Sequence, residues 1–176
     1  MTLQRYVTFL FAATIGLAVS RPASADDDKK NDKPLDNKTF VEKAAGGGMA
    51  EVEMAKAAQT QAQNAAVKKF ADRMVKDHTA INEELKTIAA GIPVTVPERL
   101  SDKCRDEIAA MQKLTGAAFD KAYMEQQVKA HQEAVDCFKK AGKEVSNMRL
   151  KEFIIKTLPT LEDHLKRAKK VRDQVQ

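Results

Sequence analysis

The sequence predicts an all-α protein: a four-helix bundle with a short extra helix in the connection between the second and third long helices. Apolar residues recur every three or four positions along four segments of about 26 residues, as in amphipathic helices. Glycine and proline are scarce, with 7 Gly and 5 Pro in 176 residues. No run alternates apolar and polar residues as a half-buried strand does.

The first 25 residues have the pattern of a signal peptide. Arg5 precedes an apolar run from Tyr6 to Val19, and Ala23-Ser24-Ala25 is a small-x-small cleavage site. We therefore expect cleavage near Ala25–Asp26 and a secreted protein, periplasmic in a Gram-negative host. Residues 26–37 are charged and predict a flexible tether, which leaves residues 38–176 as a single bundle domain without a transmembrane segment.

The first long helix is predicted over residues 38–63, with Asp36 or Asn37 as its N-terminal cap. Its unusual feature is the run 46–48, three consecutive glycines that each cost a helix about 1 kcal/mol relative to alanine. They indicate a kink or the close approach of another backbone. A phosphate-binding loop is excluded because no strand precedes the run and no Lys-Ser/Thr follows it.

The second long helix is predicted over residues 65–90, capped by Asn64 and ended by Gly91. A proline-containing connection leads to the short helix, predicted over residues 98–114. The break at 115–116, Thr-Gly, separates this short helix from the third long one.

The third long helix is predicted over residues 117–141, with Gly142 ending it. The fourth is predicted over residues 148–175, with Asn147 as its cap. Pro159 lies inside this last segment and should kink or split the helix, because proline has no N–H to donate and its ring crowds the preceding turn.

Charge and cysteine content limit the class of protein. The formal charge of +5 falls to +3 once Arg5 and Arg21 leave with the signal peptide, since 28 basic and 25 acidic residues remain. This small excess, together with few aromatic residues and predicted export, argues against a nucleic-acid partner. Cys104 and Cys137 are compatible with one disulfide in an oxidising compartment or with two buried thiols, and the sequence does not decide between them.

All three histidines of the chain lie on apolar stripes, each on a different long helix. His78, His131 and His164 are each about 13 to 16 residues from the start of the predicted helix, so they should meet near the centre of a bundle whichever way each helix runs. On the first helix Glu51 lies at the same height, on a stripe of alanine and glycine. Glu53 is about 200° away around the helix and should face solvent.

Imidazoles beside a buried carboxylate suit a metal ion, because each neutral ring offers one lone pair and the carboxylate offsets the charge. The sequence therefore predicts one transition-metal ion, zinc, iron, manganese or copper, bound by Glu51, His78, His131 and His164. Gln127 and Thr160 lie one turn before His131 and His164, respectively, and are candidates for orienting the rings. The alternative is a metal-free cluster of His–Glu hydrogen bonds with water.

Four stretches resemble a known family: FVEKAAGGGMAEVEMAKAA, VKKFADRMVKDH, LTGAAFDKAYMEQQVKAHQEAV and TLPTLEDHLKRA. In order and spacing they are similar to the bacterial domain of unknown function 4142, over about residues 40–168. The resemblance implies a ferritin-like bundle, export, and family motif positions at the predicted Glu and His ligands; it implies no settled activity.

One departure from ferritin-like di-iron proteins bears on the metal. Those proteins carry Glu-x-x-His on two helices. The residues three before the histidines are Val75, Val128 and Leu161, so the carboxylates that bridge two irons are missing. A single ion fits this sequence better than a di-iron centre or a stored mineral.

The predicted function is that of an exported metal-binding protein, for metal handling or stress protection. We identify no catalytic residue and expect neither an enzyme nor an organic cofactor. The alternative is a non-catalytic envelope module that binds another protein, in which the inward histidines form a metal-free polar cluster. A weaker alternative is a pH-responsive bundle, loosened when its buried histidines gain a charge.

Overall fold

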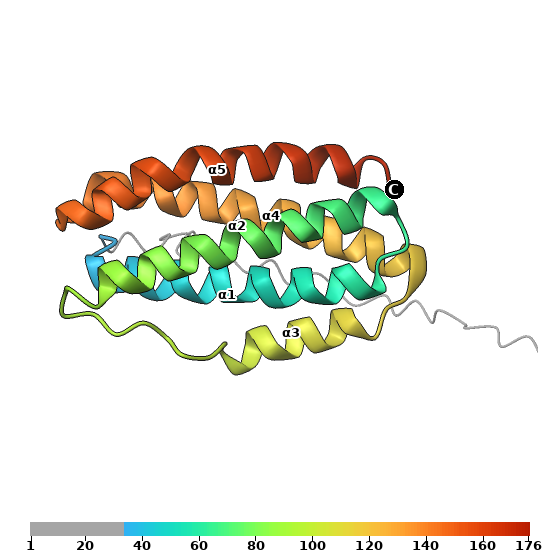
Figure 1. The fold of residues 1–176 in the computed structure, drawn as a ribbon, viewed down its shortest axis with the longest axis horizontal. Helices are drawn as coiled ribbons and strands as arrows, with labels where there is room; N and C mark the ends of the chain where they lie inside the picture. Colours follow the sequence, from blue (N-terminus) through green and yellow to red (C-terminus); the bar gives the residue numbers. More distant parts are fainter. Residues whose placement is uncertain (1–33) are drawn as a thin grey trace, which may run out of the picture. The chain divides into compact units, whose positions relative to one another are not determined.

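Five helices make up most of the part of the chain that the structure describes, residues 34–176 of a computed structural model (Figure 1). They are α1 (Asn37–Gln61), α2 (Ala65–Ala89), α3 (Asp102–Gln112), α4 (Gly116–Glu144) and α5 (Met148–Arg172). The predicted all-helical bundle with one short extra helix is confirmed. The predicted signal peptide, residues 1–25, and residues 26–33 of the tether lie outside the described residues.

The four long helices form a ring in which every neighbouring pair is antiparallel (Figure 1). Helix α1 packs against α2, α2 against α5, α5 against α4, and α4 against α1. Because α2 and α4 are diagonal and parallel, the chain must return along the whole bundle between them. The connection that makes this return contains α3, which packs on the outside against α1 and α4.

Side-chain caps set the beginnings of three long helices. Asp36 accepts a hydrogen bond from a backbone N–H in the first turn of α1, Asn64 does so in α2, and Asn147 in α5. Each cap satisfies a backbone donor that the helix itself leaves without a partner. The predictions for these three helix starts are therefore confirmed, with Asp36 rather than Asn37 as the cap of α1.

The prediction for the short helix was too long. Helix α3 begins at Asp102 rather than at Glu98, because Ser101 accepts the N–H of Cys104 at 3.3 Å and forms the cap. The predicted break before α4 is present. There Gly116 has a φ of +63°, a conformation that side chains with a Cβ rarely adopt.

The predicted helix end at Gly142 was wrong, and the predicted kink or split at Pro159 is not a split. Helix α4 continues through Gly142 to Glu144, and it ends where the buried Val145 becomes extended. Helix α5 is not split at Pro159, which lies inside one continuous helix. Proline removes the hydrogen bond to the carbonyl four residues earlier, at Ile155, and that residue is 72% exposed, so water can reach this carbonyl.

The apolar core is divided into two clusters. The Phe40 cluster contains Leu35, Phe40, Val41, Ala45, Leu85, Ile88, Ala89, Val135, Phe138, Ala141, Val145, Leu150, Phe153, Ile154 and Leu161. The Phe119 cluster contains Ala50, Met54, Ala55, Ala58, Ala62, Val67, Phe70, Ala71, Met74, Ile108, Phe119, Tyr123, Met124 and Ala168. Along every long helix one cluster gives way to the other near the middle of the helix.

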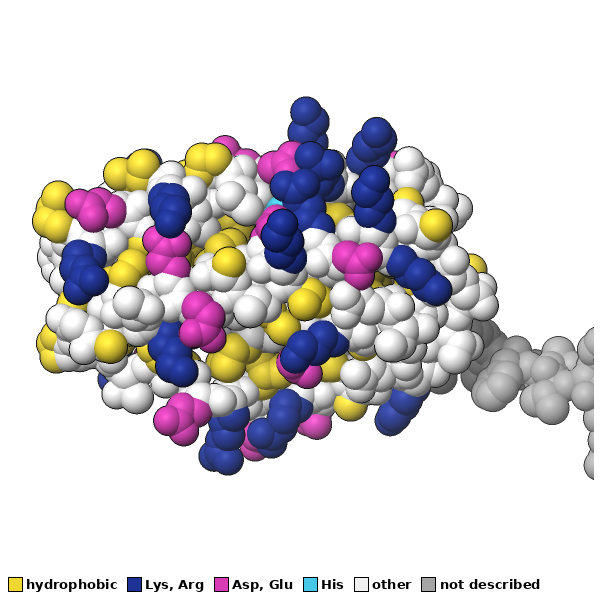
Figure 2. All heavy atoms as spheres, viewed as in Figure 1, with side chains coloured by type: hydrophobic (Ala, Val, Ile, Leu, Met, Phe, Trp, Pro, Cys, Tyr) yellow, Lys and Arg dark blue, Asp and Glu magenta, His cyan; other side chains and the backbone are white. Residues whose placement is uncertain are grey.

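Charged side chains of both signs are mixed over the face shown in Figure 2, and basic side chains gather over α5. Five basic residues lie within the last seven positions of that helix, where positive charge favours the C-terminal end of the helix dipole. None of the helices in residues 34–176 combines the length and the apolar composition needed to cross a membrane.

The three consecutive glycines of α1 have different surroundings. A Cβ added at Gly48 would overlap the side-chain oxygen of Asn82 on α2, whereas a Cβ at Gly46 or Gly47 would meet no atom within 4 Å. A close approach is therefore present at Gly48 only, and it involves the side chain of Asn82 rather than the predicted backbone. At the other two positions the structure offers no steric reason for glycine.

Replacing Gly48 with alanine should lower the free energy of unfolding by about 1–3 kcal/mol, because the Asn82 side chain must move inside a packed helix pair. Gly47→Ala is the matched control, and we expect it to raise stability by up to about 1 kcal/mol through helix propensity. Urea unfolding measures both. If the double variant Gly48→Ala/Asn82→Ala is no more stable than Gly48→Ala alone, the clash with Asn82 is not the cause of the loss.

Candidate metal centre

The three histidines meet in the middle of the bundle, at the level where the two apolar clusters divide. His78 of α2, His131 of α4 and His164 of α5 are 4%, 1% and 0% exposed. Their ring centroids are 5.4, 5.3 and 5.3 Å apart, and one nitrogen from each ring lies within 4.8 Å of the other two. The predicted convergence of the three histidines is therefore present.

Backbone and carboxylate partners assign the proton on two of the rings. The Nδ1 of His131 lies 2.9 Å from the backbone carbonyl of Gln127, which can only accept, so Nδ1 donates and Nε2 keeps its lone pair. The Nε2 of His164 donates to Oδ2 of Asp77 at 2.9 Å. Its Nδ1 thus keeps a lone pair, and this atom is buried without a hydrogen-bond partner.

The third ring approaches one of these lone pairs. The Nε2 atoms of His78 and His131 are 3.3 Å apart, so His78 donates this hydrogen bond in the metal-free protein. Two nitrogen ligands about 2.0–2.1 Å from one tetrahedral ion would be separated by roughly the same 3.3 Å. The spacing therefore suits either a shared proton or a shared metal ion.

The environment keeps two of the imidazoles neutral. Burial, followed by the nearby His131 and His164, holds the pKa of His78 well below its usual 6.5. Burial also lowers the pKa of His164 to about 4, although the hydrogen bond to Asp77 opposes this shift. Neutral imidazole is the form that binds a metal, so both rings are ready to act as ligands at neutral pH.

Glu51 is buried beside this cluster but is not one of its members. Burial raises the pKa of its carboxyl group, while His131 and the Gln127 amide lower it in part. Its Oε2 atom has no hydrogen-bond partner. Within residues 34–176, the grouping at 4.8 Å contains the three imidazoles alone, so Glu51 lies next to the cluster rather than in it. Glu53 is exposed and pairs with Lys56, as its predicted outward direction requires.

Helix α4 carries a column of polar groups that leads away from the cluster. Tyr123, Gln127 and His131 follow one another at intervals of four residues, and all three are buried. The Tyr123 hydroxyl and both side-chain atoms of Gln127 have no hydrogen-bond partner. The interior therefore has four unpartnered polar atoms beside the histidines once Oε2 of Glu51 is included, which is unusual for a protein core.

The candidates for orienting the rings are corrected in two ways. Gln127 orients His131 through its backbone carbonyl rather than through its side chain. Thr160 does not hold His164, whose one hydrogen bond goes to Asp77. Sequence reasoning missed Asp77, which directly precedes His78 in the chain. An available signal was its position about 100° around α2 from His78, toward the neighbouring helix.

A pocket of about 460 Å³ lies between α1, α3 and α4 and reaches the cluster. Glu51, His78 and His131 form part of its wall, together with apolar side chains from all three helices. Such a volume is within the usual range for small-ligand sites. The centre therefore faces a cavity on the α1–α4 side, whereas His164 lies behind it.

Both cysteines border this pocket, and both are free thiols in the structure. Cys104 packs against the Phe119 cluster, whereas Cys137 packs against the Phe40 cluster. The structure contains free thiols rather than the disulfide, but they are partly buried and not the two buried thiols of the second alternative.

The metal-free protein should lose stability as the pH falls from about 6.5 to about 4. In this window the unfolded chain protonates His164, while the native ring stays neutral because its pKa is about 4. The unfolded state thus binds more protons, and the loss from this residue reaches about 3 kcal/mol. Chemical unfolding at a series of pH values measures it, with His164→Gln as the control. If the free energy of unfolding falls with pH at the same slope in the wild type and in His164→Gln, His164 is not the cause of the loss.

Comparison with known proteins places the fold and the family. The chain resembles two structures of CopM, one described as the Cu(II)-bound form (TM-score 0.65, 17% identity, 79% of this chain and 97% of that one) and one as the Cu(I)-bound form (TM-score 0.64, 18% identity, 78% and 95%). At this identity the likeness concerns the fold. No curated protein matches in sequence. The model of the domain of unknown function DUF4142 matches residues 20–171, so the chain belongs to this family.

Proposed function

We propose that this protein binds one transition-metal ion at His78, His131 and His164, as an exported protein of metal handling or stress protection. The observation that carries the proposal is the convergence of three buried imidazole nitrogens within 4.8 Å. In addition, Nδ1 of His164 is buried without a hydrogen-bond partner. Burying such an atom is unfavourable unless something binds it.

The hydrogen bonds define how each ring would bind. His131 would use Nε2 and His164 would use Nδ1, because their other nitrogens are engaged with Gln127 and Asp77. His78 would use Nε2 and would carry its proton on Nδ1 instead. Glu51, whose Oε2 atom has no partner, would be the fourth ligand or would bind a water at the open position.

Copper is the first candidate for the ion. Imidazole ligands suit copper, zinc and iron, so the donor set alone does not choose among them. The structural neighbours are described as Cu(I)- and Cu(II)-bound, which favours copper here by analogy of fold. We assign no catalytic residue and no organic cofactor.

A second candidate function is supported by the same hydrogen bonds. The His78–His131 contact and the His164–Asp77 pair satisfy several ring nitrogens without any metal. The cluster would then be structural, and the protein a non-catalytic envelope module that binds another protein through its surface. In this alternative, water molecules form the hydrogen bonds of Nδ1 of His164 and Oε2 of Glu51. It predicts equal stability with and without added metal.

Protein exported to the periplasm and purified without chelators or a His tag should contain about one equivalent of one transition metal, as measured by elemental analysis. His131→Ala should lose this metal, because it removes a ring in contact with both other histidines. His78→Ala should lower both the metal content and the melting temperature.

Val135→Ala is the matched control, since it truncates a buried residue one turn further along α4 without touching a ring nitrogen. It should lower the melting temperature and keep the metal. If the wild type contains no metal, even after reconstitution with zinc, iron, manganese and copper, the proposed metal site is contradicted and the metal-free polar cluster is favoured.

Asp77→Asn should lower metal affinity about 10- to 100-fold, the usual effect of removing a carboxylate that orients a ligating histidine. Asp163→Asn is the control, because Asp163 also pairs with Arg73 but has no contact with a ring nitrogen of His164. Competition with a chromogenic chelator gives both affinities. Equal affinities in the two variants would show that Asp77 does not position His164.

A further inference from the structure

The pocket beside the histidines is lined by four of the nine sulfur-containing residues of the chain. Cys104 and Cys137, its only cysteines, border the pocket together with Met54 and Met111. The wall also contains Glu51, a buried carboxyl group with one unpartnered oxygen, and the rings of His78 and His131. Thiolates and thioethers are the ligands that select Cu(I) among biological metal ions.

The two ends of the pocket differ in charge. The carboxylates of Glu107 and Glu51 act on Cys104, whereas the side chains of Lys43 and Lys140 act on Cys137. At the second end Lys140 pairs with Glu144 at 4.0 Å, and Glu133, one turn before Cys137, also lines the pocket. The first environment therefore favours a cation more than the second. Glu107 is itself paired only loosely, with Lys103 at 3.9 Å on the exposed face of α3.

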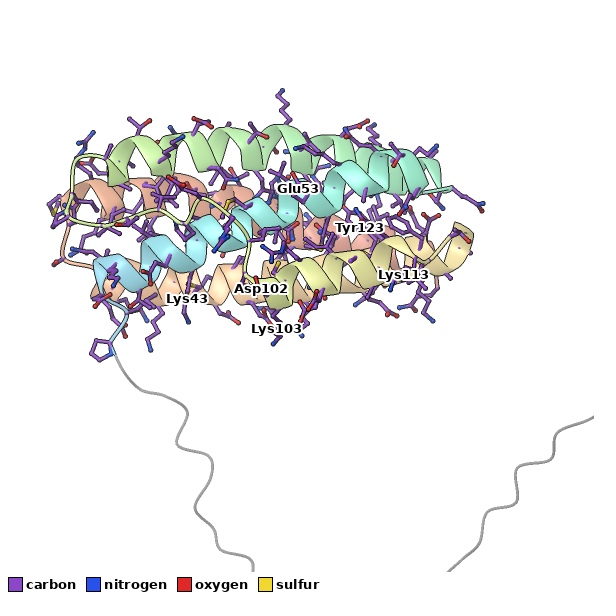
Figure 3. The ribbon with its side chains drawn as sticks, turned by 90° about the horizontal axis from the view of Figure 1, so that it is seen from below. Lys43, Glu53, Asp102, Lys103, Lys113 and Tyr123 are labelled. Carbon is purple, nitrogen blue, oxygen red and sulfur yellow. The ribbon has the colours of Figure 1, made fainter. Side chains whose placement is uncertain are left out.

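Figure 3 shows where Lys43 and the start of α3 lie along the bundle. Lys43 lies on the part of α1 that precedes the start of α3, and Asp102 and Lys103 mark that start. Beyond it, α3 lies alongside α1. The acidic end of the pocket is thus the end that α3 covers, and Cys104 is in the first turn of this helix.

The sulfur groups at the covered end belong to one packed group. Met54 of α1 is a member of the Phe119 cluster, and Cys104 and Met111 of α3 pack against that cluster. Cys104 and Met111 are seven residues apart, so they share one face of α3. This face is turned toward the pocket, because both side chains line it. Cys104 and Met111 are only partly buried, which leaves them accessible from solvent.

We propose that the covered end of this pocket is the path by which Cu(I) reaches the three histidines, with Cys104, Met111 and Met54 as transient sulfur ligands. The proposal rests on the proposed function, since it requires the histidine site as the destination. Glu51 lies at the inner end of the path, where it interacts electrostatically with both Cys104 and His131. Cys137, at the lysine end, has no part in it.

The transfer involves no change of oxidation state. Cu(I) displaces the proton of the Cys104 thiol, which leaves to solvent, and a Cu–S bond forms. When the ion passes to an imidazole lone pair, this Cu–S bond breaks, a Cu–N bond forms, and the sulfur takes a proton back from solvent. A group that acts only along the path changes the rates of uptake and release together and leaves the final affinity unchanged.

The test compares Cys104→Ser/Met111→Leu with Cys137→Ser, which removes the other pocket thiol. Metal-free protein is mixed with the Cu(I)–bicinchoninate complex in a stopped-flow instrument, and loss of the complex's colour reports uptake. Titration with the same chelator gives the affinity. We expect uptake and release about tenfold slower or more in the double variant, with affinity within about twofold of the wild type and Cys137→Ser unchanged. Cys104→Ser alone should shift the rates in the same direction, and thermal melts establish that each variant is folded.

Three results would overturn the proposal. Unchanged rates in the double variant would show that copper reaches the histidines by another path. A loss of affinity as large as the loss of rate would make the sulfur groups ligands of the final site. Equal slowing in Cys137→Ser would remove the preference for the acidic end. Failure of the proposed function is recognised separately, because the wild type would then take up no copper at any rate.

Discussion

The burial of three imidazoles in the middle of an apolar bundle is the constraint on which the rest of the site depends. Removing an imidazole from water disfavours its charged form, so His78 and His164 are neutral in the native protein. A neutral ring still needs a partner for its N–H, and the Gln127 carbonyl and the Asp77 carboxylate supply two of them. These two hydrogen bonds leave one ring nitrogen of His131 and one of His164 with a free lone pair.

The apolar clusters on either side hold this arrangement. The Phe40 and Phe119 clusters pack at opposite ends of the bundle, and the polar layer lies where they meet. Phe70 of the Phe119 cluster makes edge contacts with both Tyr123 and His131. Packing against large rings limits the rotamers available to His131, and a site whose supporting side chains are rigid keeps its geometry without a metal.

Not every buried polar group of the bundle belongs to the site. Asp120 is 3% exposed, yet its carboxylate accepts hydrogen bonds from the backbone N–H groups of Gln63 and Asn64, in the turn between α1 and α2. It joins α4 to that turn and leaves no oxygen without a partner. Glu51 differs, because its Oε2 atom has none and borders a cavity. The contrast between these two acids separates a structural carboxylate from one available to a ligand.

The helices, their caps and the meeting of the histidines followed from the sequence, because they depend on residue spacing along one helix and on the common length of four helices. Asp36, Asn64 and Asn147 act on the turn beside them, and a midpoint stays a midpoint in either helix direction. The ends at Glu144 and Arg172, the partner of His164 and the exclusion of Glu51 from the nitrogen cluster were decided only by tertiary structure. Each depends on how far one helix is rotated and shifted against another. No periodic pattern specifies a rotation of a few tens of degrees. Such a rotation decides that Asp77 rather than Thr160 is the hydrogen-bond partner of His164, and it sets the distance between Glu51 and the rings.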